Sequence, residues 1–573
     1  QPDTGLSSRG WIEGTPTGVL NKTRIGQLTD GAALQLNWNL PRHKFMVGGS
    51  LDAAQSDFSS RQRLGLMDAS HRVYTDPVAL DPVFIAGRED IRNNVFAGRS
   101  TTYAGYFSET FSPWDNVHLS FSGRFNHTRV KNRLKARSRA GYDNLHDLLD
   151  LNTYRPTVVV CPGTDAAACP AQPNYNFRAN WDRDAWLASD PYYGLGQYSE
   201  RPTTESFTYN AFNPAAGISV SPLESLNLFF NWSQGTRTPS SVELGCAYDA
   251  TLVPQDPTDP DSPKIPRSFA SIGGACTLPT TLSGDPFLPQ IFARTQEFGL
   301  RGTVFHDWEW NAGLYRTDLR DDIYLVGITA NRSFFDTIGN TRRQGIELGL
   351  SGKVGIFDVR LGYGYTDATF QSNLYLLSPH NSSAAVASPP DVTYDARGRP
   401  VQALQDMIRV EPGDRMPGIP LHNLNLSLNA HLTPAWELGL SLVAHSQAFV
   451  RGNENNDHTV GAYDYVQRST GTGYAWVANR PFTWSGDVPG YVIFNLKSRY
   501  EVLPGLSVFG LVNNLFDKRY FTAGRLGINP FAPPEQGVTG PGGWNYNSSD
   551  WLNTTLVAPG APRAFWAGIE YRY

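Results

Sequence analysis

The chain has 573 residues, of which 40% are hydrophobic and 12% aromatic, and its formal net charge is −5. No apolar run approaches the roughly 20 residues that a membrane-spanning helix needs, so a helical membrane protein is excluded. Lysine and arginine are scattered along the chain, which leaves no basic stripe for binding nucleic acid. No charged-then-apolar leader opens the chain, and Gln1 is therefore expected to begin a processed or truncated polypeptide.

Residues 1–30 are polar and rich in turn-forming residues, and they predict a loop. A period of two begins at Gly31, where Leu34, Leu36 and Trp38 alternate with polar residues. A tight turn at 41–42 leads into a second alternating run at 45–51. Such alternation is typical of strands with one apolar and one polar face. The stretch from 52 to about 99 has no sustained period and predicts a long loop.

The order of strand, short turn, strand and long loop then repeats along the chain. Further strand pairs are predicted at 103–111 with 117–125, 207–220 with 226–232, 298–304 with 308–314, 346–350 with 357–365, 424–432 with 436–444, and 492–500 with 506–515. A last strand at 562–573 carries its apolar residues on one face, namely Phe565, Ala567, Ile569, Tyr571 and Tyr573. Because a strand needs a neighbour on each side, this terminal strand is expected to close a barrel against an earlier strand.

Three features favour an all-β, antiparallel transmembrane barrel over a soluble sandwich. Each strand has one lipid-compatible face and one polar face that suits a water-filled lumen. Turns of a few residues alternate with loops of tens of residues, whereas a sandwich would have short loops at both ends. Aromatic residues lie near the strand ends, as in the interface girdles of outer-membrane proteins: Trp38, Trp114, Trp232, Trp308, Trp436 and Tyr500.

The four cysteines fall into two of the long loops. Cys161 and Cys169 lie in one loop, and Cys246 and Cys276 lie in another. Loops outside the cell are in an oxidising compartment, so two local disulfides are predicted, one within each loop. No cysteine or histidine cluster has the spacing of a zinc site, and neither a metal nor another cofactor is predicted.

The polar strand faces indicate a lumen and no catalytic site. The sequence has no phosphate-binding glycine loop, no His-Glu-x-x-His pair and no nucleophile elbow, so an enzyme is not predicted. The carboxylates on these faces have arginine or lysine at similar depth, which is typical of a solvated, charge-balanced lumen. They are Glu309, Glu347, Asp358, Glu437, Glu501 and Glu570.

An aromatic-rich segment is the better candidate for contact with a small-molecule or metal-chelate ligand. Aromatic side chains offer a large contact area at a low cost in conformational entropy. The candidates are Tyr463, Tyr465, Tyr474, Trp476 and Trp484, with His458 nearby in the sequence. The alternative is that these side chains pack among the loops themselves.

Several short motifs, taken in order, carry a family resemblance. They are QGTRTPSSVEL at 234–244, DPFL at 285–288, EFGLRG at 297–302, RQGIEL at 343–348 and NNLFDKRY at 513–520. Together with the aromatic-ended last strand, they resemble the barrel of TonB-dependent outer-membrane receptors over most of the chain. The resemblance implies a barrel of about 22 strands with an N-terminal plug, embedded in the lipid of the bacterial outer membrane. It also implies uptake of a scarce ligand, often a ferric siderophore, driven by a TonB-type energy-coupling complex.

This chain departs from that family pattern near its start. No plug-like segment and no energy-coupling box precede the first predicted strand, and about fifteen strands are predicted where bacterial barrels have even numbers. We expect residues 1–573 to be the barrel domain of a longer receptor, with 1–30 in an extracellular loop. The alternative is that part of 5–28 adds a sixteenth strand and that the barrel closes as a passive, porin-like channel. An extracellular β-rich adhesin is a third class.

Overall fold

A computed structural model describes the strands and most of the turns of the chain. The described residues are 11–12, 15–70, 72–76, 92–137, 158–161, 176–179, 199–200, 205–241, 243–244, 252–254, 261, 264–266, 288–305, 307–329, 332–394, 400–535, 543, 545 and 550–572. Among them, no helix has the length and apolar character needed to cross a lipid bilayer.

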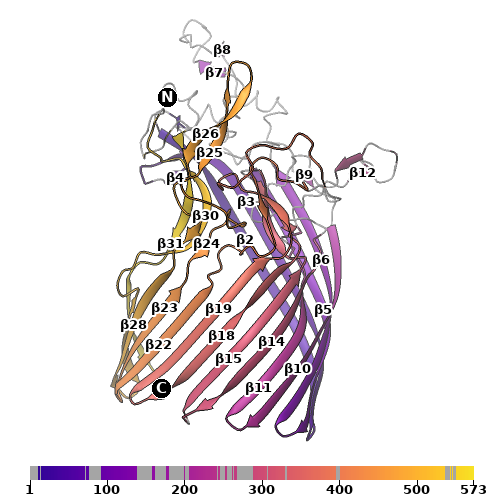
Figure 1. Ribbon diagram of the computed structural model, residues 1–573, viewed down its shortest axis with the longest axis vertical. Coiled ribbons are helices and arrows are strands. Elements are labelled where there is room, and N and C mark those ends of the chain that lie inside the picture. The colour runs from indigo at the N-terminus through magenta and orange to yellow at the C-terminus, as the bar shows by residue number, and fades with distance from the viewer. Residues whose placement is uncertain are drawn as a thin grey trace.

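One antiparallel sheet of 18 strands forms the body of the molecule (Figure 1). Three of them, β1 (Trp11–Ile12), β4 (Val73–Tyr74) and β9 (Ser199–Glu200), have two residues each, which leaves 15 long strands. The long strands are β2 (Thr15–Asn39), β3 (His43–Met67), β5 (Arg92–Trp114), β6 (Val117–Arg137), β10 (Glu205–Leu223), β11 (Leu226–Arg237), β14 (Ile291–Val304), β15 (Trp308–Arg320), β18 (Thr341–Val354), β19 (Phe357–Phe370), β22 (His422–Thr433), β23 (Trp436–His445), β28 (Tyr491–Leu503), β29 (Leu506–Asn513) and β32 (Ala564–Tyr571). Each pairs with the next, which confirms the predicted antiparallel architecture of about fifteen strands.

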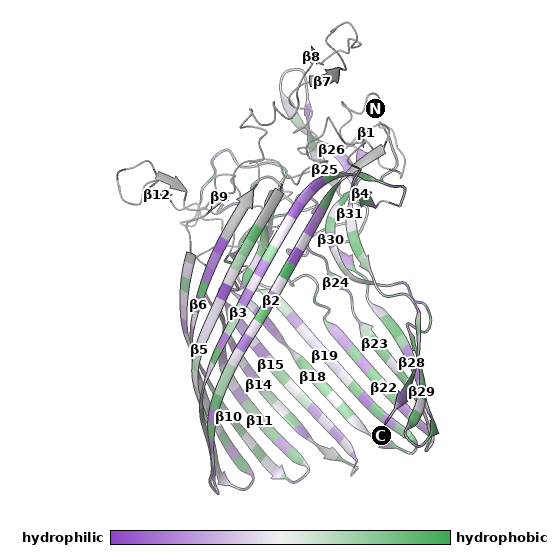
Figure 2. Ribbon diagram, turned by 180° about the vertical axis from the view of Figure 1, so that it is seen from behind, coloured by the Kyte–Doolittle hydropathy of each residue, from purple (hydrophilic) through white to green (hydrophobic). Residues whose placement is uncertain are grey.

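The two faces of this sheet differ in polarity, as the alternation predicted. Leu34, Leu36 and Trp38 of β2 lie on the outer face and are 73%, 54% and 45% exposed. Residues directly opposite each other on paired strands share a face, so Leu34 belongs to a continuous apolar surface around the sheet. The inner face carries polar and charged residues and lines a cavity of about 890 Å³ in the lumen. Figure 2 shows the alternation as green and purple segments along the lower parts of the long strands.

The two ends of the sheet also differ, as they do in outer-membrane barrels. Short turns such as 41–42, 115–116 and 434–435 join the strands at one end, and the long segments rise from the other end (Figure 1). β32 pairs with β29 along its whole length. Among the described residues no ladder joins β32 to β2, so this part of the sheet is curved but open, and the closure expected for the last strand is not seen there.

The first strands are much longer than predicted. β2 and β3 have 25 residues each, whereas about 9–11 residues of a tilted strand cross a bilayer. β2 begins at Thr15, so the prediction of a loop throughout 1–30 is wrong, and β3 likewise runs to Met67 within the predicted loop at 52–99. The period of two did not reveal these parts of the strands, because the outer face becomes polar where the strands leave the bilayer. On upper β3, Asp57 is exposed on the outer face while Phe58 is buried on the inner face.

Small strand pairs and apolar cores organise the segments at the loop end. The pairs are β7 (Val158–Cys161) with β8 (Asn176–Ala179), β12 (Leu252–Pro254) with β13 (Lys264–Pro266), β16 (Ile323–Thr329) with β17 (Arg332–Thr337), β20 (Leu374–Leu377) with β21 (Met407–Val410), β24 (Ala448–Phe449) with β27 (Asp487–Val488), β25 (Tyr463–Ser469) with β26 (Tyr474–Pro481), and β30 (Phe521–Asn529) with β31 (Leu552–Pro559). A core around Phe370 and Ile408, both fully buried, joins the top of β19 to β20 and β21. Tyr324 of β16 packs against this core, so separate loops form one body.

Candidate functional site

A turn at 451–458, between β24 and β25, holds a network of buried amide side chains. Asn453 and Asn455 are almost completely buried. Asn381, which follows β20, donates hydrogen bonds to the carbonyl of Gly452 at 2.8 Å and to Asn455 Oδ1 at 3.2 Å. Asn453 Nδ2 donates to the carbonyl of Gly486 at 2.9 Å. Because these amides find partners on different segments, they hold three loops in one arrangement.

Glu454 places a buried carboxylate in the same turn. Its Oε1 accepts hydrogen bonds from the Tyr324 hydroxyl at 3.1 Å and from the Gly452 N–H at 3.2 Å. Burial raises the pKa of Glu454, and it also raises the pKa of the Tyr324 hydroxyl. The guanidinium of Arg451 lies 4.9 Å from the centre of the Tyr324 ring, in a cation–π contact. These three side chains connect the turn to β16.

A pocket of about 390 Å³ lies where this turn meets the upper ends of β22, β23 and β28, and we call it the rim pocket. Its lining combines aromatic rings with polar and cationic side chains, among them Tyr324, Phe449, Tyr491, Phe521, His445 and Arg451. His445 and Tyr491 stand in lumen-facing positions of their strands, directly opposite each other. A cavity with aromatic walls and a few polar groups is typical of sites for small ligands.

The rings of the rim pocket are fixed by contacts with one another. The His445 and Tyr491 rings meet edge to face with centres 5.1 Å apart, and Tyr491 lies 4.5 Å from the Tyr520 ring. The guanidinium of Arg415 lies 5.2 Å from the centre of the Phe449 ring. Side chains held in this way lose little further freedom when a ligand binds.

The predicted aromatic segment forms the hairpin of β25 and β26, and its aromatic side chains share one face. The register places Tyr465 opposite Ala478, and it places the Trp476 and Tyr474 positions on the same side of the ribbon. This aromatic face carries Tyr463, Tyr465, Tyr474 and Trp476. The three tyrosines are each at least half exposed. On the opposite face, Asp464 accepts a hydrogen bond from Asn553 Nδ2 at 3.1 Å, which anchors the hairpin to β31.

The structure places His458 and Trp484 side by side, away from the aromatic face of the hairpin. His458 Nδ1 accepts a hydrogen bond from the Ser382 N–H at 3.0 Å, and Nε2 donates to the Trp484 carbonyl at 3.1 Å. The His458 ring also packs edge to face on Phe482, with centres 5.1 Å apart. Burial lowers the pKa of His458, which favours the neutral ring. The Nε2 hydrogen bond holds the backbone of Trp484, and the Nδ1 hydrogen bond holds the loop at Ser382.

Three of the six acids predicted for the lumen, Asp358, Glu437 and Glu570, lie at ion-pair distance from a base. Asp358 lies 2.7 Å from His431 Nε2 and 3.5 Å from Lys353 Nζ. Near the last strand, Glu570 lies 3.4 Å from Arg499 Nε. In the described part of the chain, no group of three or more histidine, cysteine or acidic side chains is placed to hold a metal ion.

The predicted disulfides fall largely outside the described residues. Cys161 is the last residue of β7. Cys169, Cys246 and Cys276, as well as the terminal Tyr573, lie beyond the described ranges. The pairs Cys161–Cys169 and Cys246–Cys276 therefore stay predictions.

Comparisons with known proteins agree with this geometry. A family model described as "TonB dependent receptor-like, beta-barrel" matches residues 3–515. The chain belongs to this family. Among curated proteins no match is found.

Solved structures of TonB-dependent receptors resemble the chain in fold. The ferric yersiniabactin uptake receptor FyuA from Yersinia pestis gives a TM-score of 0.51 at 10% identity, over 97% of this chain and 56% of that one. The ferric-catecholate import receptor Fiu from E. coli K12 gives 0.49 at 14% identity, over 96% and 55%. The siderophore receptor PiuA from Acinetobacter baumannii gives 0.48 at 13% identity, over 96% and 56%. The chain thus spans little more than half the length of these structures.

Membership of the TonB-dependent receptor family places the sheet in the bacterial outer membrane, with the loop end outside the cell. The aromatic face and the rim pocket are therefore reached from the extracellular side. The rim pocket was missed in the sequence because it forms only when several loops meet above the strands. A signal was present nevertheless: Tyr491 is an aromatic residue in the polar register of β28, and His445 faces it from β23.

Proposed function

We propose that the chain takes part in TonB-dependent uptake of a scarce ligand, a ferric siderophore or a similar metal chelate, across the outer membrane. The rim pocket is the observation that carries this proposal. It lies between the extracellular loops and the lumen, and it combines aromatic walls with the guanidinium of Arg451. A ferric chelate built from catecholate or carboxylate groups is anionic and often carries rings. Aromatic faces and an arginine suit such a ligand.

The arrangement of the loops supports a route with two stages. The exposed aromatic face of the β25–β26 hairpin offers a first contact surface, and Trp484, whose carbonyl is held by His458, offers a second. The rim pocket then provides a more enclosed site that opens toward the lumen. Tyr463, Tyr465, Tyr474, Trp476 and Trp484 are proposed as ligand contacts, with His458 as the residue that positions Trp484.

The energy for transport is proposed to come from a TonB-type coupling complex that acts through the plug of the receptor. This partner follows from the family, as does the outer-membrane lipid that surrounds the strands. FyuA, Fiu and PiuA are described as receptors for ferric yersiniabactin, ferric catecholates and a siderophore, which supports the choice of ligand class.

Binding of a panel of ferric siderophores to the purified chain in detergent tests the ligand class. We expect one chelate class to bind, and Tyr491→Ala to weaken that binding about fivefold or more, since a buried aromatic contact is worth about 1 kcal/mol or more. Tyr500→Ala is the matched control, because Tyr500 lies on the outer face of the same strand and is 48% exposed. Equal losses in the two variants would contradict the proposed site.

Conductance in planar bilayers addresses the alternative of a passive channel. A chain that binds no chelate from the panel, yet conducts small ions steadily after insertion, would favour the porin-like function. The polar lumen wall is compatible with such conduction, whereas the fixed aromatic rings of the rim pocket have no role in it.

A further inference from the structure

The outer face of β6 changes from aromatic to cationic along its length. Phe121 and Phe125 are about half exposed and belong to the apolar surface that faces lipid. The next residues on that face beyond His127 are Arg129 and Lys131, and both are exposed. At about 3.3 Å per residue, they lie about 13 and 20 Å beyond Phe125 along the tilted strand. Since about 9–11 residues of a tilted strand cross a bilayer and β6 begins at Val117, we place these two cations near the headgroups of the outer leaflet.

A third cation, Arg99, lies on the same surface and places two like charges opposite each other on paired strands. Arg99 of β5 stands directly opposite Lys131, and like charges in directly opposite positions destabilise a pair of strands. Arg129 donates a hydrogen bond to Ser206 Oγ at 3.1 Å. Within the described part of the chain, no carboxylate lies at ion-pair distance from Arg99, Arg129 or Lys131. We call these three residues the basic patch.

The nearest acid on this face does not neutralise the basic patch. Asp57 of β3 stands opposite Ala97, one outward position beyond Arg99. Its carboxylate accepts a hydrogen bond from Gln55 Nε2 at 3.1 Å. The patch therefore carries three positive charges on an exposed surface with no built-in counter-ion among the described residues.

An apolar groove of about 530 Å³ lies next to the basic patch, on the side toward the membrane. Its walls include Leu34, Leu51, Tyr103 and Phe125. Gly49 and Gly105 stand directly opposite each other at its floor. A Cβ atom added at Gly105 would meet no other atom within 4 Å, so the space above it is open. The groove is continuous with the lipid-facing surface, because Leu34 and Phe125 belong to both.

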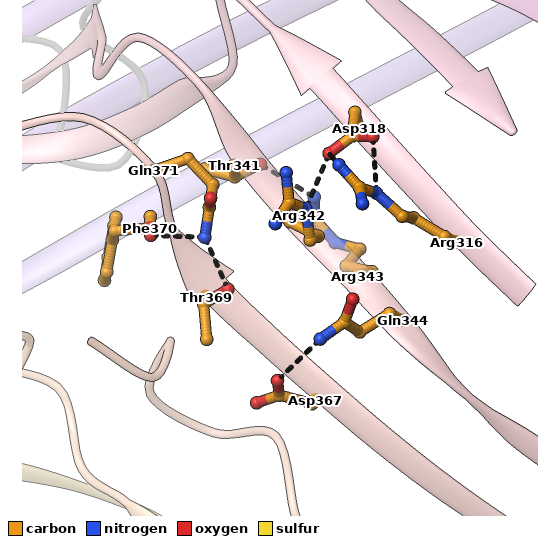
Figure 3. Close-up of polar contacts among 10 residues, drawn as sticks. All are labelled: Arg316, Asp318, Thr341, Arg342, Arg343, Gln344, Asp367, Thr369, Phe370 and Gln371. Atoms are coloured by element: carbon orange, nitrogen blue, oxygen red, sulfur yellow. Dashed lines mark hydrogen bonds and ion pairs between the residues drawn. The ribbon is translucent and has the colours of Figure 1, made fainter. Parts of the chain in front are cut away.

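A different part of the outer face shows how the sheet neutralises cations elsewhere. Figure 3 shows Arg316 of β15 and Arg342 of β18 on either side of Asp318. Arg316 Nε lies 2.8 Å and Arg342 Nε lies 2.7 Å from the Asp318 carboxylate oxygens. There the counter-ion is a residue of the chain, whereas the basic patch has none of this kind.

We propose that the basic patch and the groove together bind a phosphorylated lipid of the outer leaflet. One acyl chain lies in the groove over Gly49 and Gly105, and a headgroup phosphate lies between Arg99, Arg129 and Lys131. Arginine and lysine are the residues that bind phosphate in proteins, and the phosphate relieves the repulsion between Arg99 and Lys131. A lipid fits better than free phosphate because the groove adjoins the cations and opens to the hydrocarbon region. This site is separate from the lumen and from the rim pocket.

Binding of diphosphoryl lipid A to the folded chain in detergent, followed by native mass spectrometry, tests the proposal. With about 1 kcal/mol for each basic side chain near an anionic lipid, the double variant Arg99→Gln with Lys131→Gln should bind about 30-fold more weakly. The matched control is Arg301→Gln with Arg360→Gln, which removes the same charge from lumen-facing positions. This control should bind within about threefold of the unchanged chain. An equal loss in both double variants would overturn the proposal.

Two further measurements keep the test independent of the charge variants. The unchanged chain should prefer diphosphoryl lipid A over its fully dephosphorylated form, and equal binding of the two would refute the role of the phosphate. Gly105→Leu fills the groove without altering charge, and it should weaken binding of the phosphorylated lipid several-fold. If inorganic phosphate displaced the lipid at matched concentration, the patch would be an anion site and not a lipid site. Heat-dependent gel mobility establishes that each variant is folded.

Discussion

Two sides of the sheet meet the extracellular space in different ways. On the tall side, β2, β3, β5 and β6 have 25, 25, 23 and 21 residues, whereas β22, β23, β29 and β32 on the low side have 12, 10, 8 and 8. At about 3.3 Å per residue, β3 extends for about 80 Å and β23 for about 33 Å. The tall strands pass far beyond the bilayer, while the low strands end near its surface and compact loops continue from them (Figure 1).

This difference shows that the alternation of apolar and polar residues has opposite meanings within the bilayer and above it. In the bilayer the outer face is apolar because it meets lipid, and the inner face is polar because it meets the lumen. Above the bilayer on the tall side, the outer face meets water and the inner face is covered by the chain. Phe58, Phe96 and Val130 are thus buried on the inner face of strands whose lower inner face is polar. On the low side, the same transition is made by separate loop cores such as that around Phe370.

The largest effect is expected where a low strand meets lipid for most of its length. Leu426 of β22 pairs with Leu361 and Leu442 on the outer face. We expect Leu426→Arg to cost about 2–4 kcal/mol of unfolding free energy, because the guanidinium would enter hydrocarbon. Urea titration of the chain in lipid vesicles measures this cost.

The neighbouring position provides the control for that experiment. Asn425 faces the lumen, so Asn425→Arg should cost much less than Leu426→Arg. Equal costs would mean that the lipid-facing and lumen-facing sides of β22 are wrongly assigned. The low strands would then not differ from the tall strands in the way described above.

The lower parts of the strands could be predicted from the sequence because lipid and lumen impose a strict alternation there. Leu34, Leu36 and Trp38 obey it, and their strand and its outer face were correctly predicted. The upper parts could not be predicted, since both faces of the tall strands mix polar and apolar residues. On β3 the buried inner positions include Ser56 and Gln62 beside Phe58 and Leu64, which obscures the period.

The candidate site was predictable only in part, for a related reason. The aromatic residues of the hairpin are close in sequence, so Tyr463, Tyr465 and Trp476 could be grouped before their common face was known. The rim pocket joins Tyr324 to Tyr491 and Phe521, which are far apart in sequence. Its formation depends on the buried network at 451–458, and nothing in a single sequence indicates that Asn381 would donate to Gly452.

A smaller effect is expected from the buried carboxylate that helps to hold the low-side loops. Burial raises the pKa of Glu454 above its ordinary value of 4.5, so the fold favours the protonated form. The stability contributed by that form is complete below the ordinary pKa and is lost as the pH rises through the raised value. Glu454→Gln should therefore stabilise the turn at pH 7, by about 1.4 kcal/mol for each unit by which the pKa is displaced.

Hydrogen exchange of the amides at 451–458, corrected for the intrinsic effect of pH, measures this change. The unchanged chain should become more protected in this turn from pH 7 to pH 5, and the Glu454→Gln variant should not. Asp457→Asn serves as the control, because Asp457 lies in the same turn and is exposed. A pH response that persists in Glu454→Gln would assign the titration to another group. Glu454 would then not be the cause of any pH-dependent stability in the low-side loops.

The smallest change in unfolding free energy is expected for a substitution on the tall side just above the bilayer. Leu28 and Leu34 of β2 lie on the same outer face and are 62% and 73% exposed. Neither side chain is packed within the protein, so the two positions differ mainly in whether lipid or water surrounds them. Leu34 stands opposite Gly49 within the lipid-facing surface, whereas Leu28 stands opposite Gln55, at the level of the basic patch. Leu28→Arg should change the unfolding free energy by no more than about 0.5 kcal/mol, as substitutions in contact with water do. Leu34→Arg should cost about 2 kcal/mol or more, since lipid surrounds that position. Unfolding in vesicles distinguishes the two, and a comparable cost for both would place the bilayer surface above Leu28 and make the upper tall strands part of the membrane.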